Sequence, residues 1–339
     1  MKNYSQLAAA LVMSLAIGGA AQAQAPRPGL VVVSKGENAL KIVDPKTLMV
    51  VGQVGVGVMP HEVALSSDGK LALVTNYGPK MAGTSLSLID VDAKKEIQRV
   101  TLLNLKGPQG EVFGDLIGPH GVAFFDGKFY FTAEGSKKIG RYDPSKNQID
   151  WVQEIGQERT HMLVIDKKTN TIYTANVNSG TVTAVEPSRD GGHWTNTVIP
   201  TGKGDEGIDI SPDGKEVWAA NSGDGTVTVI DTSSKKAVAT VDVGTKHSNR
   251  LKFTPDGKLA LISDIANGDL VVVDTASRKV VKRINLGKSA EGILIVPDGS
   301  RAFVAVSSED KLTVLDLKTF AVIGEVVGMK DADGMAWRQ

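Results

Sequence analysis

Three of the five histidines stand at the start of short apolar runs. Because these runs are similar, the fold can bring their equivalent positions, and so the three side chains, together. They are His61, His120 and His161. Further along the chain, acidic or amide residues take the same place before similar runs: Glu206, Asn249, Glu291 and Asp333. If these seven positions converge, imidazole and carboxylate groups face one another, which is a set of groups able to hold a divalent cation.

The chemistry of these side chains does not determine which divalent cation would bind. Histidine favours zinc, manganese, iron or copper, and carboxylates extend the choice to magnesium or calcium. We therefore predict a divalent metal (Mg, Mn, Zn or Ca) with ligands drawn from His61, His120, His161, Glu206, Glu291 and Asp333. A neutral imidazole could instead serve as a general base. The plainer alternative is that a water-filled channel needs a polar lining and that these residues only solvate it.

The candidate catalytic residues are His120, His161, Glu134 and Arg250, of which Glu134 and Arg250 would orient a substrate. Arg250 and His247 flank Asn249 and could meet an anionic substrate, whereas His193 is expected on the opposite face. Glu134 belongs to a second set, predicted at the ends of the second strands on the same face: Lys35, Asn76, Glu134, Asn176, Asn221, Asp264 and Ser307. Most of this set should be turn formers. Ligand contact is expected first of Glu134, Asn76 and Asn176.

A repeat of four short strands must position these residues. Residues 205–246 show it most clearly, because alternating apolar runs are separated by the turn SPDGK and by Gly-rich and Ser-rich turns. An acidic residue that ends a strand recurs seven times, 42 to 53 residues apart by subtraction, which is typical of a propeller blade. These residues are Asp44, Asp90, Asp143, Glu186, Asp231, Asp274 and Asp316.

The two ends of the chain predict how the ring closes. The first repeat begins at Leu30 without an innermost strand, and residues 332–337 resemble the innermost strands at 206–210 and 291–295. The fold prediction is therefore an all-β, seven-bladed propeller of four-stranded antiparallel blades over residues 26–339. Its first blade is closed by the C-terminal strand, which removes an open sheet edge.

Two insertions lie beside the predicted site. Residues 104–118 lengthen the segment before His120, and residues 78–83 enlarge the turn after Asn76. The longer insertion could be a lid with Phe113 or Leu116 as an apolar wall, or a plain surface loop.

Composition excludes several classes of function. Cysteine is absent, so thiol catalysis, thiolate metal sites and disulfides are excluded. The 38 basic and 38 acidic residues balance, and aromatic residues are few, which argues against nucleic-acid binding. Residues 1–25 read as a secretory signal peptide, whose apolar stretch at 7–21 is too short to span a membrane. We predict a monomer that is periplasmic or secreted.

Residues 30–339 resemble the YVTN-repeat (YncE-like) seven-bladed propellers. The segments that carry the resemblance are 74–76, 173–176, 211–215 and 229–244. One blade, at 118–121, 131–134 and 139–144, resembles the streptogramin (virginiamycin B) lyases. That resemblance implies elimination across an ester bond by a histidine and acidic residues, with a magnesium ion in the central funnel.

Together these observations predict an exported propeller with a divalent-metal site in its central channel. It would act on a small-molecule or oligosaccharide-like ligand, rich in oxygen, by elimination or by ester or lactone opening. The alternative is a non-catalytic binding or scaffold propeller that recognises a protein or glycan partner through its rim.

Overall fold

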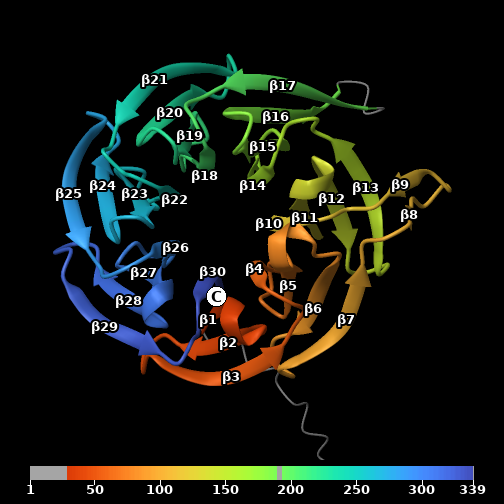
Figure 1. The fold of residues 1–339 in the computed structure, drawn as a ribbon, viewed down its shortest axis with the longest axis horizontal. Coiled ribbons are helices and arrows are strands. Elements are labelled where there is room, and N and C mark those ends of the chain that lie inside the picture. Colours follow the sequence, from red (N-terminus) through yellow and green to blue (C-terminus); the bar gives the residue numbers. More distant parts are fainter. Residues whose placement is uncertain (1–28, 189–192, 339) are drawn as a thin grey trace, which may run out of the picture.

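The computed structural model describes residues 29–188 and 193–338. In these residues seven four-stranded antiparallel sheets stand around a central axis, as predicted (Figure 1). The predicted signal peptide, residues 1–25, lies outside the described residues. None of the helices within 29–188 and 193–338 is long and apolar enough to cross a membrane.

The blades follow one another in chain order, each running from the axis outward. The first contains β30 (Ala332–Arg338), β1 (Gly29–Ser34), β2 (Ala39–Asp44) and β3 (Met49–Gly55). The second contains β4 (Pro60–Leu65), β5 (Leu71–Asn76), β6 (Ser85–Asp90) and β7 (Lys95–Thr101). The third contains β10 (Pro119–Phe125), β11 (Lys128–Ala133), β12 (Lys138–Asp143) and β13 (Gln148–Glu154). The fourth contains β14 (Thr160–Asp166), β15 (Thr171–Asn176), β16 (Thr181–Pro187) and β17 (Trp194–Pro200).

The remaining three blades repeat this arrangement. The fifth contains β18 (Asp205–Ile210), β19 (Glu216–Asn221), β20 (Thr226–Asp231) and β21 (Lys236–Asp242). The sixth contains β22 (Ser248–Phe253), β23 (Leu259–Asp264), β24 (Asp269–Asp274) and β25 (Lys279–Asn285). The seventh contains β26 (Ala290–Ile295), β27 (Arg301–Val306), β28 (Lys311–Asp316) and β29 (Val322–Val327). The described residues also contain four 3-10 turns: η1 (Lys35–Glu37), η2 (Pro79–Met81), η3 (Glu134–Ser136) and η4 (Ser307–Glu309).

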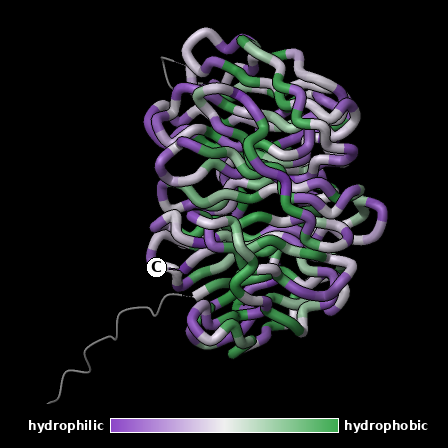
Figure 2. The backbone as a smooth tube through the Cα atoms, turned by 90° about the vertical axis from the view of Figure 1, so that its left-hand side faces the viewer, coloured by the Kyte–Doolittle hydropathy of each residue, from purple (hydrophilic) through white to green (hydrophobic). Residues whose placement is uncertain are grey.

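Apolar side chains of neighbouring blades fill the space between the sheets. One such layer, between the first and seventh blades, includes Leu30, Phe303 and Val314 with no exposed surface. Figure 2 shows the same division between interior and surface along the described chain. Apolar segments run through the interior, and hydrophilic turns lie toward the two faces. The core therefore fixes the innermost strands around the axis.

The ring closes through the C-terminal strand, as predicted. β30 pairs antiparallel with β1, with Leu30 opposite Trp337 and Val32 opposite Met335. Met335 and Trp337 pack against the layer between the first and seventh blades. The first and last segments of the propeller are thereby held in one sheet.

The prediction of a lid at residues 104–118 is wrong. This insertion forms a two-stranded hairpin, β8 (Leu105–Lys106) and β9 (Val112–Gly114), at the outer edge of the ring, away from the axis (Figure 1). Leu116 is fully buried between the second and third blades, and Phe113 packs against the same cluster. The packing of Leu116 and Phe113 between the outer parts of these blades therefore holds the insertion at the edge of the ring.

Candidate functional site

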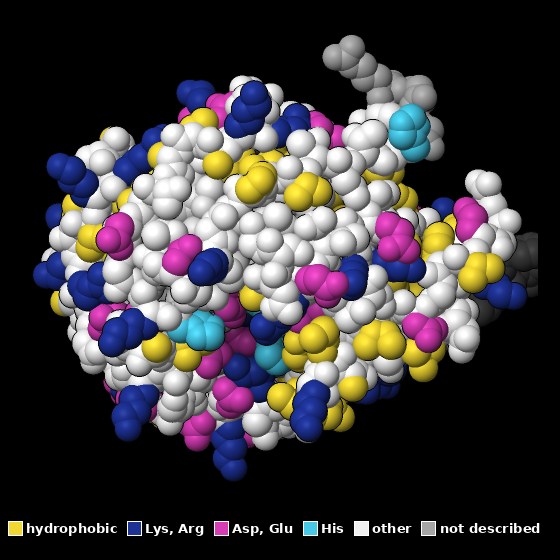
Figure 3. All heavy atoms as spheres, turned by 45° about the horizontal axis from the view of Figure 1, so that its top comes forward, with side chains coloured by type: hydrophobic (Ala, Val, Ile, Leu, Met, Phe, Trp, Pro, Cys, Tyr) yellow, Lys and Arg dark blue, Asp and Glu magenta, His cyan; other side chains and the backbone are white. Residues whose placement is uncertain are grey.

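All seven residues of the predicted set lie where an innermost strand begins, and we call this set the channel ring. The innermost strands contact one another in a closed circle, from β30 through β4, β10, β14, β18 and β22 to β26. Figure 3 shows a hollow in this face of the molecule, with histidine, acidic and basic side chains inside it. Alignment of the repeats therefore predicts the position of the ring correctly.

A β-bulge aims each ring residue at the axis. In the second blade Pro60 pairs with Asn76 and Val63 with Val74, so His61 and Glu62 together oppose the single residue Thr75. The other six blades carry a register shift at the corresponding place. Such a bulge rotates the side chain away from the regular alternation of the strand.

Hydroxyl groups behind the bulges tie the histidine-bearing blades together. Thr75 Oγ1 donates to the carbonyl oxygen of His120 at 2.7 Å, and Thr132 Oγ1 donates to that of His161 at 2.6 Å. A side chain at Gly121 would place its Cβ 2.8 Å from the carbonyl oxygen of His161, so this close approach requires glycine. The backbone at His120 and at His161 is therefore held by a hydrogen bond from the preceding blade.

The three histidines form one contiguous stack. The ring centroids of His120 and His161 lie 3.8 Å apart, and those of His61 and His120 lie 4.8 Å apart. His120 Nε2 lies 3.1 Å from His61 Nδ1. Burial and the neighbouring His161 and His61 hold the pKa of His120 well below its usual value, so this imidazole is neutral at neutral pH.

Glu134 anchors one end of the stack. It is the first residue of η3, and its Oε1 accepts a hydrogen bond from His161 Nδ1. Its other oxygen accepts the hydroxyl hydrogen of Tyr77 at 2.6 Å and lies 3.6 Å from Arg159 Nε. Burial disfavours its charge, but His161, Tyr77 and Arg159 outweigh burial and lower the pKa of Glu134. An ionised Glu134 fixes the proton of His161 on Nδ1 and leaves Nε2 with a free lone pair.

That free nitrogen faces the next blade. His161 Nε2 is buried without a hydrogen-bond partner among the described residues, and it lies 3.7 Å from Glu206 Oε1. Glu206 also accepts hydrogen bonds from Asn249 Nδ2 at 2.9 Å and from His247 Nε2 at 3.2 Å. Although burial opposes it, the hydrogen bond with His247 and the electrostatic effects of His161 and Arg250 lower the pKa of Glu206 to about 2. Two acceptors therefore face each other across a short gap.

The other half of the channel ring is neutralised by basic side chains of the protein. Lys35 Nζ lies 2.6 Å from Glu291, 3.4 Å from Asp333 and 3.2 Å from Asp331. Burial disfavours the charge of Asp333, but Lys35 and Arg250 outweigh it and lower the pKa of this carboxyl well below its usual value. The sequence pattern predicts Glu291 and Asp333 as metal ligands, whereas in the structure Glu291 pairs with Lys35, and Asp333 lies close to both Lys35 and Arg250.

Arg250 spans the channel and pairs with acidic side chains of two other blades. Its guanidinium donates to Glu62 in the second blade through both Nε, at 3.0 Å, and Nη2, and lies 3.3 Å from Asp333 in the first. Only 4% of Arg250 is exposed. Its guanidinium therefore supports the channel by holding Glu62 and Asp333, and its expected contact with an anionic substrate stays a prediction.

The second predicted set divides according to local structure. Lys35, Glu134 and Ser307 each begin a 3-10 turn and reach the channel ring. Asn76 and Asn176 are buried and bond Ser85, Ser87, Thr181 and Thr183 of their own blades. The expectation that these two asparagines contact a ligand is wrong, because their amides stabilise turns.

Sequence reasoning missed three residues of the site. Tyr77 precedes the insertion at 78–83, Arg159 lies two residues before His161, and Glu62 follows His61. The ring of Tyr77 lies 4.5 Å from that of His61 and 5.1 Å from that of His120. Glu62 could have been singled out from the sequence, because four of the other six repeats have glycine at the equivalent position.

The residues that fit a metal ion are fewer than predicted. Ligand atoms of His120, Glu134 and His161 all lie within 4.8 Å of one another, and all three side chains are buried. His120 Nδ1 and His161 Nε2 lack hydrogen-bond partners in the described part of the chain. Two nitrogens and one carboxylate suit zinc or manganese better than magnesium or calcium. These three residues therefore form a possible site for a divalent metal ion.

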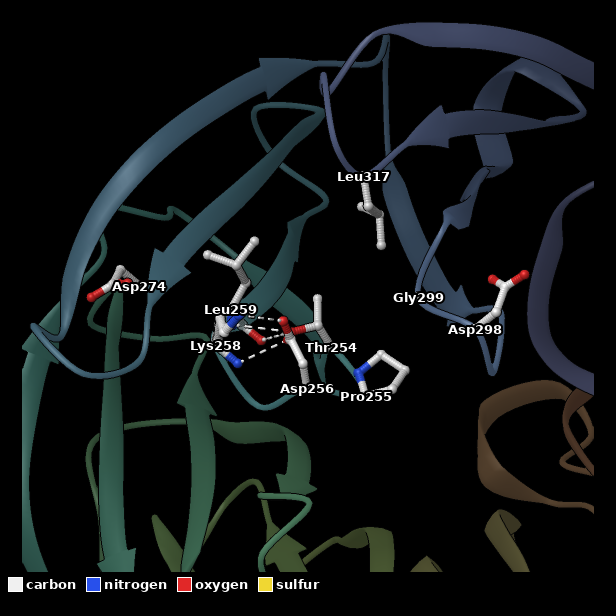
Figure 4. A pocket seen from close by; sticks show the side chains of 9 residues that line it. All are labelled: Thr254, Pro255, Asp256, Lys258, Leu259, Asp274, Asp298, Gly299 and Leu317. Carbon is white, nitrogen blue, oxygen red and sulfur yellow. Dashed lines mark hydrogen bonds and ion pairs between the residues drawn. The ribbon is translucent and has the colours of Figure 1, made fainter.

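Hollows between blades on the opposite face are less suited to chemistry. Figure 4 shows one, between the sixth and seventh blades, lined by residues of the repeated turns such as Asp256 and Asp298. Asp256 already accepts hydrogen bonds from Thr254 Oγ1 at 2.7 Å and from the Lys258 N–H at 3.1 Å. Its polar groups are thus used within the turn.

Comparison with known proteins agrees with the seven-bladed fold. The sequence matches the family described as "Lactonase, 7-bladed beta-propeller" over residues 130–292, slightly under half of the chain. A search of curated proteins finds no match. The family match thus covers β11 to the start of β26, which includes His161, Glu134 and Glu206.

Several solved structures share the fold. A functionally unknown protein from Desulfotomaculum acetoxidans has a TM-score of 0.74 at 16% identity, covering 92% of this chain and 99% of its own. The periplasmic gluconolactonase of Pseudomonas aeruginosa has a TM-score of 0.71 at 14% identity, covering 92% and 99%. Hydrazine synthase of Kuenenia stuttgartiensis has a TM-score of 0.71 at 19% identity, covering 85% and 92%. At these identities the likeness shows the seven-bladed fold alone.

Proposed function

We propose that this protein is an exported, monomeric hydrolase that opens lactones in the hollow above the channel ring. The observation that carries the proposal is the buried pair of Glu134 and His161, which leaves His161 Nε2 as an unpartnered base facing Glu206 among the described residues. The lactonase family match over this part of the chain supports the same reaction.

The mechanism follows from the two facing acceptors. A water molecule between His161 Nε2 and Glu206 Oε1 can donate one hydrogen to each, which orients its oxygen lone pair toward the hollow. His161 takes a proton as the water oxygen attacks the lactone carbonyl, and Glu134 stabilises the resulting imidazolium. The ring C–O bond then breaks, and His161 returns the proton to the departing oxygen. Water and lactone thus give one hydroxy acid.

Tyr77 and Arg159 act on this mechanism through Glu134. Their contacts keep the carboxylate ionised and oriented, and that carboxylate sets the tautomer of His161. His120 packs against the face of His161 and remains neutral. The elimination chemistry implied by the resemblance to streptogramin lyases stays a second proposal, since the same base could remove a proton next to a carbonyl.

Replacing His161 by alanine should reduce kcat for lactone opening by about 10² to 10⁴ fold, because general-base catalysis typically supplies gains of this size. The measurement is acid release from glucono-1,5-lactone and related lactones, corrected for spontaneous hydrolysis. Replacing His193, which lies before β17 at the other end of its blade, is the matched control and should leave kcat unchanged.

Two outcomes would count against this function. Equal activity of the His161→Ala and wild-type proteins would place the base elsewhere. A folded wild-type protein that opens no lactone would favour the alternative, a binding or scaffold propeller that recognises a protein or glycan through its rim.

As an alternative to the general-base role of His161, we propose that His120, Glu134 and His161 hold one divalent cation, in which case His161 is a ligand and not the base. When bound, the cation would polarise the carbonyl group of the substrate. Elemental analysis should find about one equivalent of zinc or manganese per chain, and the double variant His120→Ala/His161→Ala should lose it. The His61→Ala variant should keep the metal, because His61 lies outside the group. Absence of metal after mild purification, and of uptake on addition, would refute this site.

A further inference from the structure

Five side chains of apolar character border the channel mouth on the side of the second and third blades. Val58 and Met59 lie in the loop before β4 and are 56% and 36% exposed. Tyr77 and Met81 follow β5, and Ile117 precedes β10, and all three are partly exposed. Figure 3 shows hydrophobic side chains along one side of the hollow. We call these five residues the apolar patch.

Other blades carry charged side chains where the apolar patch has Val58 and Ile117. These two residues each stand two positions before an innermost strand. In the other five blades the residue at this place is charged and exposed: Glu158, Lys203, Lys246, Lys288 and Lys330. Since this place faces solvent in those blades, core packing does not account for an exposed valine there. Contiguous exposed apolar side chains mark a surface that binds another molecule.

The loop that carries Met59 is held in a conformation that exposes its side chain. Met59 has a φ of 46°, a region that favours glycine, and the third and fifth blades have Gly118 and Gly204 at this place. The Met59 N–H donates to Asn38 Oδ1 at 2.8 Å, and the Tyr77 N–H donates to the carbonyl oxygen of Met59 at 3.1 Å. A long side chain is therefore kept at a strained position, which is common where residues contact ligands.

Tyr77 joins the apolar patch to the candidate site. Its ring lies 4.5 Å from that of His61 and 5.1 Å from that of His120. The ring of His161 lies 3.8 Å beyond His120, and Glu206 follows in the fifth blade. The apolar patch thus lies beside the histidine stack, on the side of His161 away from Glu206.

Two glycines let the apolar patch pack against the third blade. A Cβ at Gly118 would lie 2.5 Å from Met81 Cγ, and one at Gly135 would lie 3.3 Å from Ile117 Cγ2. The Gly135 N–H also donates to the carbonyl oxygen of Ile117 at 3.0 Å. Because Gly135 follows Glu134 in η3, the patch rests on the turn that carries this carboxylate.

We propose that the apolar patch binds a hydrocarbon substituent of the substrate while the reacting lactone lies over His161. The position of the lactone rests on the proposed function. Methionine side chains adapt to the shape of a hydrocarbon chain, and the tyrosine ring adds a rigid apolar face. The substrate class is then a lactone with an alkyl chain on its ring.

Calorimetric titration with two lactams tests the apolar patch without turnover, because lactams resist hydrolysis. The probes are 2-pyrrolidinone, which has the ring alone, and 5-butyl-2-pyrrolidinone, which adds a four-carbon chain. Each methylene withdrawn from water contributes about fourfold to affinity. Since the patch is open to solvent on one side, about half of the chain should be covered, and the butyl lactam should bind about tenfold more tightly.

The double variant Val58→Lys/Met59→Ser should bring the affinities of the two lactams to within about twofold of each other. It copies Lys288 and Ser289, which the seventh blade has in the same places, and Ser289 also has a positive φ, so the loop conformation is retained. Val322→Lys is the matched control. Val322 is 52% exposed on the outer strand β29, and its replacement should keep the tenfold gain.

The outcomes separate the apolar patch from the proposed reaction. Equal or absent binding of the two lactams to the wild-type protein, or a gain that survives in the double variant, would overturn the patch even if lactones are opened. If the gain is present and is lost only in the double variant, but no lactone is opened, the patch stands as a binding surface and the proposed reaction fails.

Discussion

Replacing Arg250 by alanine should lower the free energy of unfolding by about 3 to 5 kcal/mol, the usual cost of removing one partner of a buried ion pair. The guanidinium holds Glu62 and Asp333, which come from two other blades, and all three residues are buried. Without Arg250, Glu62 would be left buried without its cation, and Asp333 would depend on Lys35 and His61 alone. Urea denaturation followed by circular dichroism measures the change.

A control and a rescue variant separate charge burial from simple loss of packing. Arg99→Ala removes an exposed pair with Glu96 and should cost less than about 1 kcal/mol. The double variant Arg250→Met/Glu62→Gln removes both charges and should recover part of the lost stability. An Arg250→Ala protein as stable as Arg99→Ala would show that the cross-channel contact contributes little.

The position of each ring residue could be predicted because the repeat fixes it. The same strand, bulge and turn recur in each blade, so alignment of the repeats is enough to place His61, His120 and His161 together. The partners of these residues could not be predicted in the same way. Arg250 reaches Glu62 across 188 positions of sequence, and no periodicity relates the two.

The repeat pattern also does not predict which carboxylates of the channel ring face histidines and which pair with basic side chains. Glu206 and Glu291 occupy equivalent places, yet Glu206 faces His161 and His247, whereas Glu291 pairs with Lys35. Burial and the neighbouring Asp333 raise the pKa of Glu291, although Lys35 opposes them, while histidines lower that of Glu206. Side chains from the adjacent 3-10 turns and loops decide between these outcomes, and those segments vary most between repeats.

Deleting residues 331–339 should make the protein insoluble or unable to fold at ordinary temperatures. The deletion removes β30, exposes the edge of β1 and leaves its Val31 and Val33 without a neighbouring strand on that side. Full burial of a side chain such as Met335 stabilises a protein by about 1.5 to 3 kcal/mol, and Met335 and Trp337 are partly buried.

The electrostatic loss adds to the loss of strand pairing. Asp333 disappears, so Lys35 keeps only Glu291 of its two buried partners and Arg250 keeps only Glu62. Against a typical total stability of about 5 to 15 kcal/mol, these losses together should unfold the ring. Expression, solubility and thermal melting of the truncated chain measure the effect, with a deletion of residues 107–111 at the tip of the peripheral hairpin as the control. A truncated chain that melts at the wild-type temperature would mean that β1 alone closes the propeller.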